Sequence, residues 1–139
     1  MKIITILVLL TLLLSCGPHR RIVVHNASGE AASVSWYIKE DSIHSSPVYL
    51  NNSRESTVRL GGADGKNRFR LTAGEGLWNP DAVTNFADDL DSMVLRWGSR
   101  SVRLDSASKI AEFLMARRGF ARDRIRITLS EPDSSRNDR

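Results

Sequence analysis

Residues 33–39, SVSWYIK, set the pattern from which the fold is predicted. Val34, Trp36 and Ile38 occupy every second position of this stretch, and the residues between them are polar or, at Tyr37, amphipathic. Because successive side chains of a β-strand point to opposite faces, a period of two predicts a strand with one buried and one mostly solvated face. The chain is therefore expected to build its core on a β-sheet.

The same alternation recurs before and after this stretch. Further strands are predicted at residues 21–26, 58–60, 69–71, 93–97, 102–104 and 124–129. The run GGADG at 61–65 is expected to close a hairpin between two of these strands, and residues 98–100 are expected to close another. Consecutive strands that are joined by short turns pair antiparallel, so the sheet is expected to be antiparallel.

Two short helices are expected late in the chain. Asn79 is predicted to be an N-cap and Pro80 the first helical residue, and apolar side chains follow at helical spacing. The pair Asp105-Ser106 is expected to cap a second helix, with Gly119 as its stop. The predicted fold class is therefore mainly β with two short helices (α+β), arranged as an antiparallel β-sandwich or as an open sheet covered by the helices.

The N-terminus has the features of an export signal. Lys2 precedes residues 3–14, which are apolar except for two threonines. Twelve residues span about 18 Å as a helix, whereas a membrane span needs about 20 residues to cross about 30 Å of hydrocarbon. The run is therefore too short for a stable span, and its length suits the hydrophobic region of a signal peptide.

The only cysteine of the chain ends this segment. Leu13-Leu14-Ser15-Cys16 resembles the lipobox of bacterial lipoproteins. The resemblance implies that residues 1–15 are a signal peptide, that cleavage falls between Ser15 and Cys16, and that the Cys16 thiol carries a diacylglyceryl group. Two or more acyl chains anchor a protein firmly to a bilayer. The alternative is a plain secretory signal that ends in a chance thiol.

The remainder of the chain is expected to form one domain. Residues 16–20 are predicted to be a lipid-anchored tether, residues 21–130 a single β-rich globular domain, and residues 131–139 a disordered polar tail. Once Cys16 is lipidated, no thiol remains for a disulfide or for a zinc site. The three histidines show no metal-ligand spacing, so neither a metal nor another cofactor is expected.

Charge is distributed unevenly along the chain. The net charge is +4, and residues 75–95 contain five acids and no base, whereas residues 96–126 contain nine bases and three acids. A basic face of this kind suits anionic lipid, lipopolysaccharide or nucleic acid. The envelope location that the lipobox implies makes nucleic acid an unexpected partner. The alternative is that the charged faces are solvated or contact each other.

The loop AGEGLW, residues 73–78, is a candidate ligand site. Gly74 and Gly76 flank Glu75, and Trp78 follows two residues after Gly76; an exposed tryptophan in such a loop would stack on a sugar ring. The alternative is that the Trp78 ring covers the core, which is the commoner role of an aromatic residue in a loop.

Three Asp-Ser pairs, at Ser42, Ser92 and Ser106, are followed by an apolar or small residue. Each resembles the O-glycosylation site that is used on exported proteins in one Gram-negative phylum. Asp-Ser is also a common turn or helix-cap pair, so a purely structural role is the alternative.

These features predict a lipid-anchored envelope protein that acts as a binding or structural accessory module, without catalysis. Its expected partners are the membrane, through Cys16, and an envelope protein or glycan. Because Gly17 is not acidic, the chain resembles lipoproteins that are sent to an outer membrane, and the domain is expected to face the periplasm. The alternative is a hydrolase that uses Glu75, Asp81 or Asp88, which would require two converging carboxylates in a deep pocket.

Overall fold

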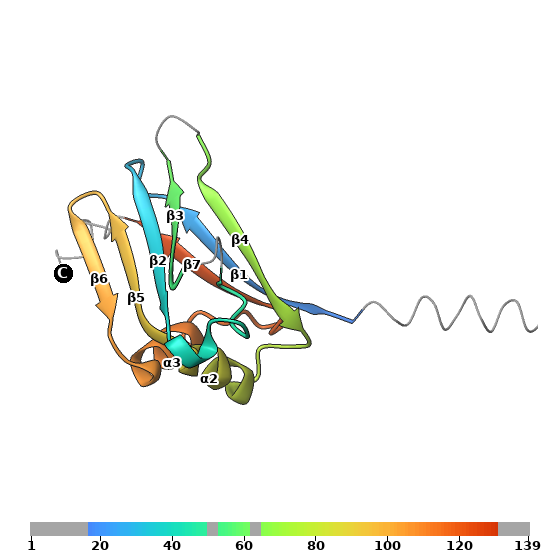
Figure 1. The fold of residues 1–139 in the computed structure, drawn as a ribbon. Coiled ribbons are helices and arrows are strands. Elements are labelled where there is room, and N and C mark those ends of the chain that lie inside the picture. Colours follow the sequence, from blue (N-terminus) through green and yellow to red (C-terminus); the bar gives the residue numbers. More distant parts are fainter. Residues whose placement is uncertain (1–16, 50–52, 62–64, 131–139) are drawn as a thin grey trace, which may run out of the picture.

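The computed structural model describes residues 17–49, 53–61 and 65–130. The predicted signal peptide, Ser15, Cys16 and the predicted C-terminal tail therefore lie outside the described residues. Seven strands of the described chain form two sheets, and two α-helices lie together at one end of them (Figure 1).

Sheet A has three strands in the order β4-β1-β7. These are β4 (Arg68–Glu75), β1 (His19–Asn26) and β7 (Arg124–Leu129). The central strand β1 pairs antiparallel with β4 and parallel with β7. The parallel pair departs from the antiparallel arrangement expected from short turns, because β1 and β7 are separated by most of the chain and no turn fixes their relative direction.

Sheet B has four strands in the order β3-β2-β5-β6, and all of its pairs are antiparallel. Its strands are β3 (Glu55–Leu60), β2 (Ala32–Ile38), β5 (Leu90–Trp97) and β6 (Arg100–Leu104). The alternating residues Val34, Trp36 and Ile38 of β2 are all buried, as the period of two predicts. The predicted hairpin at residues 98–100 is confirmed, because it joins the paired strands β5 and β6.

The predicted hairpin at residues 61–65 is wrong, because β3 and β4 lie in different sheets. The chain instead crosses from sheet B to sheet A, close to its earlier crossing from β1 to β2. Gly61 has a φ of +77°, and a Cβ atom there would lie 3.1 Å from both Asn26 Nδ2 and the Glu30 carbonyl oxygen. Glycine thus allows the two crossings to approach each other.

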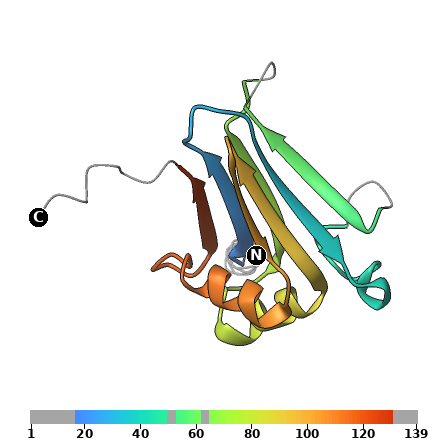
Figure 2. The ribbon, with the colours of Figure 1, turned by 90° about the vertical axis from the view of Figure 1, so that its left-hand side faces the viewer.

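Both predicted helices are confirmed, but the second ends at Met115, before the predicted stop at Gly119. In α2 (Pro80–Asp88) the Asn79 side chain accepts a hydrogen bond of 2.7 Å from the backbone N–H of Ala82. In α3 (Ala107–Met115) the Ser106 side chain accepts one of 3.4 Å from the N–H of Lys109. The helix α2 leads from sheet A to sheet B, α3 leads back, and together they cover one end of both sheets (Figure 2). A short 3-10 helix, η1 (Glu40–Ser42), follows β2.

One hydrophobic core connects the two sheets and the helices. Trp36 of β2 and Phe69 of β4 contact each other across the core, with ring centroids 6.0 Å apart. The helices add fully or almost fully buried side chains, among them Val83, Phe86 and Ile110. The fold is therefore mainly β with two helices, as predicted. Within the described part of the chain, no helix has the length and hydrophobicity to cross a bilayer.

Candidate anion-binding face

The outer face of sheet A gathers basic side chains from three strands. Inward-pointing residues such as Ile22, Leu71 and Ile125 are buried in the core, so their neighbours along each strand point outward. We call the outward-pointing basic residues of these strands the basic face: Arg21 and His25 from β1, Arg68 and Arg70 from β4, and Arg124 and Arg126 from β7.

The strand register arranges the residues of the basic face in rows across the sheet. Val23 on the central strand pairs with Arg70 on one side and with Arg126 on the other. His25 pairs with Arg68 of β4 in the next row. Because neighbouring strands lie about 4.8 Å apart, the residues of each row are close together on one surface.

The rows surround a hollow of ≈180 Å³. Its walls contain four arginines and a histidine but no carboxylate, and the lining residues are Val23, His25, Arg68, Arg70, Arg124, Arg126, Ile127 and Thr128. Arginine presents five N–H donors in a planar fork and binds phosphate or carboxylate groups through paired hydrogen bonds. The hollow therefore has the donor chemistry of an anion site.

One row of the basic face has its own counter-ion. Arg21 lies opposite Arg124 in the sheet, and like charges in this position repel. Asp123 bridges them, because its Oδ2 lies 2.7 Å from Arg21 Nη2 and 3.3 Å from Arg124 Nη2. The hydrogen bonds from Arg124 and Arg21 lower the pKa of the Asp123 carboxyl below its ordinary value of 3.8.

The other cations of the basic face lack such a counter-ion among the described residues. Arg68, Arg70 and Arg126 form no side-chain hydrogen bond or ion pair with any residue that the structure describes. Their donors are accordingly available to a ligand. The Thr128 hydroxyl and the His25 imidazole lie opposite each other in the hollow, whereas no carboxylate lines it, and its excess of arginine donors suits the binding of an anion.

Trp78 lies over the core, the alternative that the sequence left open. Its side chain is 1% exposed, its ring contacts Phe86 edge-on at 5.6 Å, and its Nε1 donates a hydrogen bond of 3.1 Å to the Arg21 carbonyl. It contributes to the wall of a second hollow, of ≈340 Å³, but offers almost no ring surface for stacking. Glu75 is exposed at the end of β4 and does not line that hollow.

The three Asp-Ser pairs lie in different environments. Ser92 is 4% exposed within β5, which leaves no room for a glycan in the folded chain. Ser42 is partly exposed at the end of η1. The Ser106 hydroxyl is engaged as the N-cap of α3.

The carboxylates considered for a hydrolase are each exposed and separate. Asp81 lies in the first turn of α2, Asp88 at the end of the same helix, and Glu75 at the end of β4. Each of five surface hollows in the described chain is lined by at most one carboxylate. No group of three or more histidine, cysteine, aspartate or glutamate side chains suited to a metal ion occurs among the described residues.

The sequence contained a signal for the basic face that strand prediction alone does not use. Arg68 and Arg70, like Arg124 and Arg126, are two residues apart, so each pair must share one face of its strand. The excess of bases in residues 96–126 includes only the second pair. The sequence did not reveal that β4 and β7 flank the same strand, β1.

Comparison of the chain with family models, with curated proteins and with solved structures found no match. Function is therefore argued from the residues themselves.

Proposed function

We propose that the chain is a bacterial lipoprotein, anchored to an envelope membrane through Cys16, whose domain binds anionic groups on its basic face. The observation that carries the binding role is the hollow beside Arg68, Arg70 and Arg126, three cations without a described counter-ion. The lipobox-like sequence at residues 13–16 supports the proposed envelope location. Membrane anchorage would concentrate such a face among the components of the envelope.

The class of ligand is indicated by the proposed envelope location and by the arginine N–H donors of the hollow. Arginine forks fit phosphate and carboxylate groups, and these groups are carried by envelope glycans and glycolipids. A water molecule occupies about 30 Å³ of liquid, so a hollow of ≈180 Å³ holds a group the size of a phosphate with part of its sugar. We therefore propose a phosphorylated glycan as the ligand, with most of its chain outside the hollow.

The binding role is tested with the full lipidated chain in detergent micelles at low salt. The probes are a phosphate-bearing core oligosaccharide of lipopolysaccharide and the same oligosaccharide after enzymatic dephosphorylation, compared by isothermal titration calorimetry. We expect the phosphorylated form to bind at least about 10-fold more tightly, because hydrogen bonds to charged groups contribute about 1.5–3 kcal/mol each. Equal affinity for the two probes would contradict the proposal.

A matched pair of variants locates the binding. Arg70→Gln with Arg126→Gln removes the cations on either side of Val23. The control, Arg59→Gln with Arg96→Gln, removes two cations placed in the same way around Ser33 in sheet B. We expect about a 10- to 100-fold loss for the first variant and less than about a 2-fold change for the control, where the donors are less dense.

The anchor is tested separately. The mass of the mature N-terminal peptide should include fatty acyl chains on Cys16, and the protein should enter the detergent phase on phase separation. Cys16→Ser should leave the protein in the aqueous phase. A Cys16 peptide without lipid mass would refute the envelope anchor while leaving the anion-binding test intact.

A further inference from the structure

The first described residues lead directly into a rigid strand. Only Gly17 and Pro18 separate Cys16 from His19, where β1 begins, so the predicted tether ends earlier than residue 20. Three Cα–Cα steps span at most about 11 Å. If Cys16 is lipidated, as the proposed function requires, this end of the domain is held within that distance of the bilayer surface.

Hydrogen bonds join three segments at this end of the domain. Gly76 donates its N–H to the Pro18 carbonyl at 2.7 Å, and Trp78 donates its N–H to the Arg122 carbonyl at 2.6 Å. Arg21 donates its N–H to the Asp123 carbonyl at 2.9 Å. We call these joined segments the anchor end; it comprises residues 17–21, 76–78 and 118–124.

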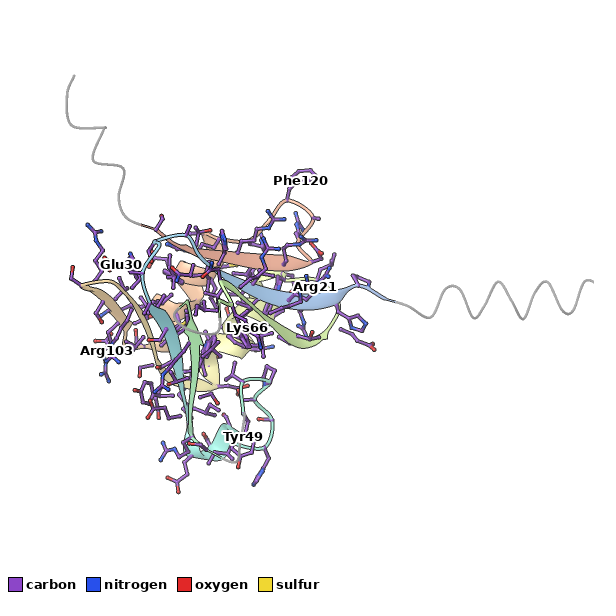
Figure 3. The ribbon with its side chains drawn as sticks, turned by 90° about the horizontal axis from the view of Figure 1, so that it is seen from above. Arg21, Glu30, Tyr49, Lys66, Arg103 and Phe120 are labelled. Carbon is purple, nitrogen blue, oxygen red and sulfur yellow. The ribbon has the colours of Figure 1, made fainter. Side chains whose placement is uncertain are left out.

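The anchor end displays apolar side chains to solvent. Three large hydrophobic residues of the described chain are exposed, and two of them, Leu77 and Phe120, belong to the anchor end. Phe120 is 105% exposed and extends from the tip of a loop, beyond the body of the domain (Figure 3). A fully exposed aromatic side chain is suited to the boundary between headgroups and acyl chains.

The charge of the anchor end complements an anionic membrane. It carries five arginines, at positions 20, 21, 118, 122 and 124, and the carboxylate Asp123, which is paired with two of them, while the exposed Glu75 lies beside it, opposite His19. Basic residues beside a lipid anchor are attracted to anionic headgroups within about a Debye length. Apolar insertion and cationic attraction thus act at the same end to which the anchor is attached.

We propose that the anchor end lies in the headgroup layer, with Phe120 and Leu77 inserted into the bilayer and with Arg20, Arg118 and Arg122, which are not part of the basic face, facing lipid phosphates. This inference rests on the proposed lipid anchor at Cys16. A single tether would leave the domain free to rotate, whereas a second contact from the loop of Phe120 fixes its orientation. The occupant of this surface is the membrane itself.

The test uses the full lipidated chain in vesicles of phosphatidylethanolamine and phosphatidylglycerol. Phe120→Cys is labelled with an environment-sensitive fluorophore, since the natural thiol at Cys16 is blocked by its lipid. The matched control is Val102→Cys on β6, because Val102 is 36% exposed and β6 lies on the side of the domain opposite the start of β1 (Figure 1).

We expect the label at position 120 to shift its emission to shorter wavelength and to be quenched several-fold more by doxyl-labelled lipid than the label at position 102. Equal quenching at the two positions, in protein whose Cys16 carries lipid by mass spectrometry, would overturn the inference and leave the anchor standing. Absence of lipid on Cys16 would overturn both. Because Phe120 is fully exposed, its replacement should not affect folding.

Discussion

The outer faces of the two sheets carry the same arginine arrangement in different surroundings. In sheet A, Arg70 and Arg126 lie on either side of Val23. In sheet B, Arg59 and Arg96 lie on either side of Ser33. Each pair flanks one residue of a central strand, so we look for the difference between the two faces in the neighbours of each pair.

The neighbours of the sheet B pair satisfy one another. Ser35 and Thr57 share a hydrogen bond of 2.7 Å between their hydroxyls, and Tyr37 donates one of 3.1 Å to the Glu55 carboxylate. Glu55 also lines the hollow beside Arg59 and Arg96. The hollow on sheet A contains further cations and no carboxylate. A surface whose polar groups pair internally contributes to stability, whereas one with an excess of donors has capacity for a ligand.

The most severe test of this comparison reverses the charge on sheet A. Arg70→Glu with Arg126→Glu should weaken binding of the phosphorylated oligosaccharide by more than about 100-fold, because two attractive charges become repulsive. Calorimetry at two ionic strengths should show that the wild-type affinity falls with salt while the variant is nearly insensitive. An unchanged affinity would place the ligand elsewhere on the domain.

A second prediction concerns the internal pairing on sheet B. Ser35 is 3% exposed, so Ser35→Ala removes its hydrogen bond to Thr57 at a buried position. The free energy of unfolding should fall by about 1–2 kcal/mol, measured by urea denaturation. Oligosaccharide binding should stay at the wild-type value. A loss of binding without a loss of stability would mean that sheet B also contributes to the ligand site.

A third prediction concerns Asp123, the counter-ion within the basic face. Asp123→Asn should tighten oligosaccharide binding by about 2- to 5-fold, since a negative charge beside the hollow is removed. The same change should lower the melting temperature at pH 7, because Arg21 and Arg124 then face each other without a carboxylate.

The pH dependence of this variant has a definite sign. The pKa of Asp123 is lowered in the folded chain, so the stability contributed by its ionised form is fully present above its ordinary value of 3.8 and is lost as the pH falls further. The difference in melting temperature between wild type and Asp123→Asn should therefore shrink below that pH. A constant difference down to pH 2 would show that Asp123 acts through packing alone.

The smallest expected effect is at Glu55. Glu55→Gln keeps an oxygen acceptor for Tyr37 but removes the only carboxylate that lines the sheet B hollow. The affinity of the sheet B hollow for phosphorylated oligosaccharide is expected to be weak. The variant should raise this affinity by at most about 2-fold, because only two arginines line the hollow. The measurement is best made in the Arg70→Gln, Arg126→Gln background. A rise to wild-type affinity would show that the carboxylate, and not the number of cations, separates the two faces.

Local patterns predicted the elements of this fold, and long-range packing decided their arrangement. The alternation around Trp36 and the caps at Asn79 and Ser106 depend on neighbouring residues, so the sequence reveals them directly. The separation of β3 from β4 and the parallel pairing of β1 with β7 depend on which inner faces bury each other. The alternation of buried and exposed residues along a strand is the same whichever strand pairs with it, so it cannot reveal the partner.

The same distinction explains the candidate site. Each arginine of the basic face could be assigned to the outward side of its strand from alternation alone. Their assembly around one hollow could not, because it requires β4 and β7 to flank β1. Trp78 shows the converse limit, since a glycine-rich stretch just before a tryptophan does not reveal whether its ring is buried.

The parallel pairing of the first strand with the last fixes when sheet A can be completed. Synthesis delivers β1 first and β7 last, so β1 has an unpaired edge in sheet A until the final residues of the domain have been made. Arg124 and Arg126 arrive with that closing strand. A chain that is clipped before residue 124 would lack both the completed sheet and two of the four arginines that line the hollow on sheet A.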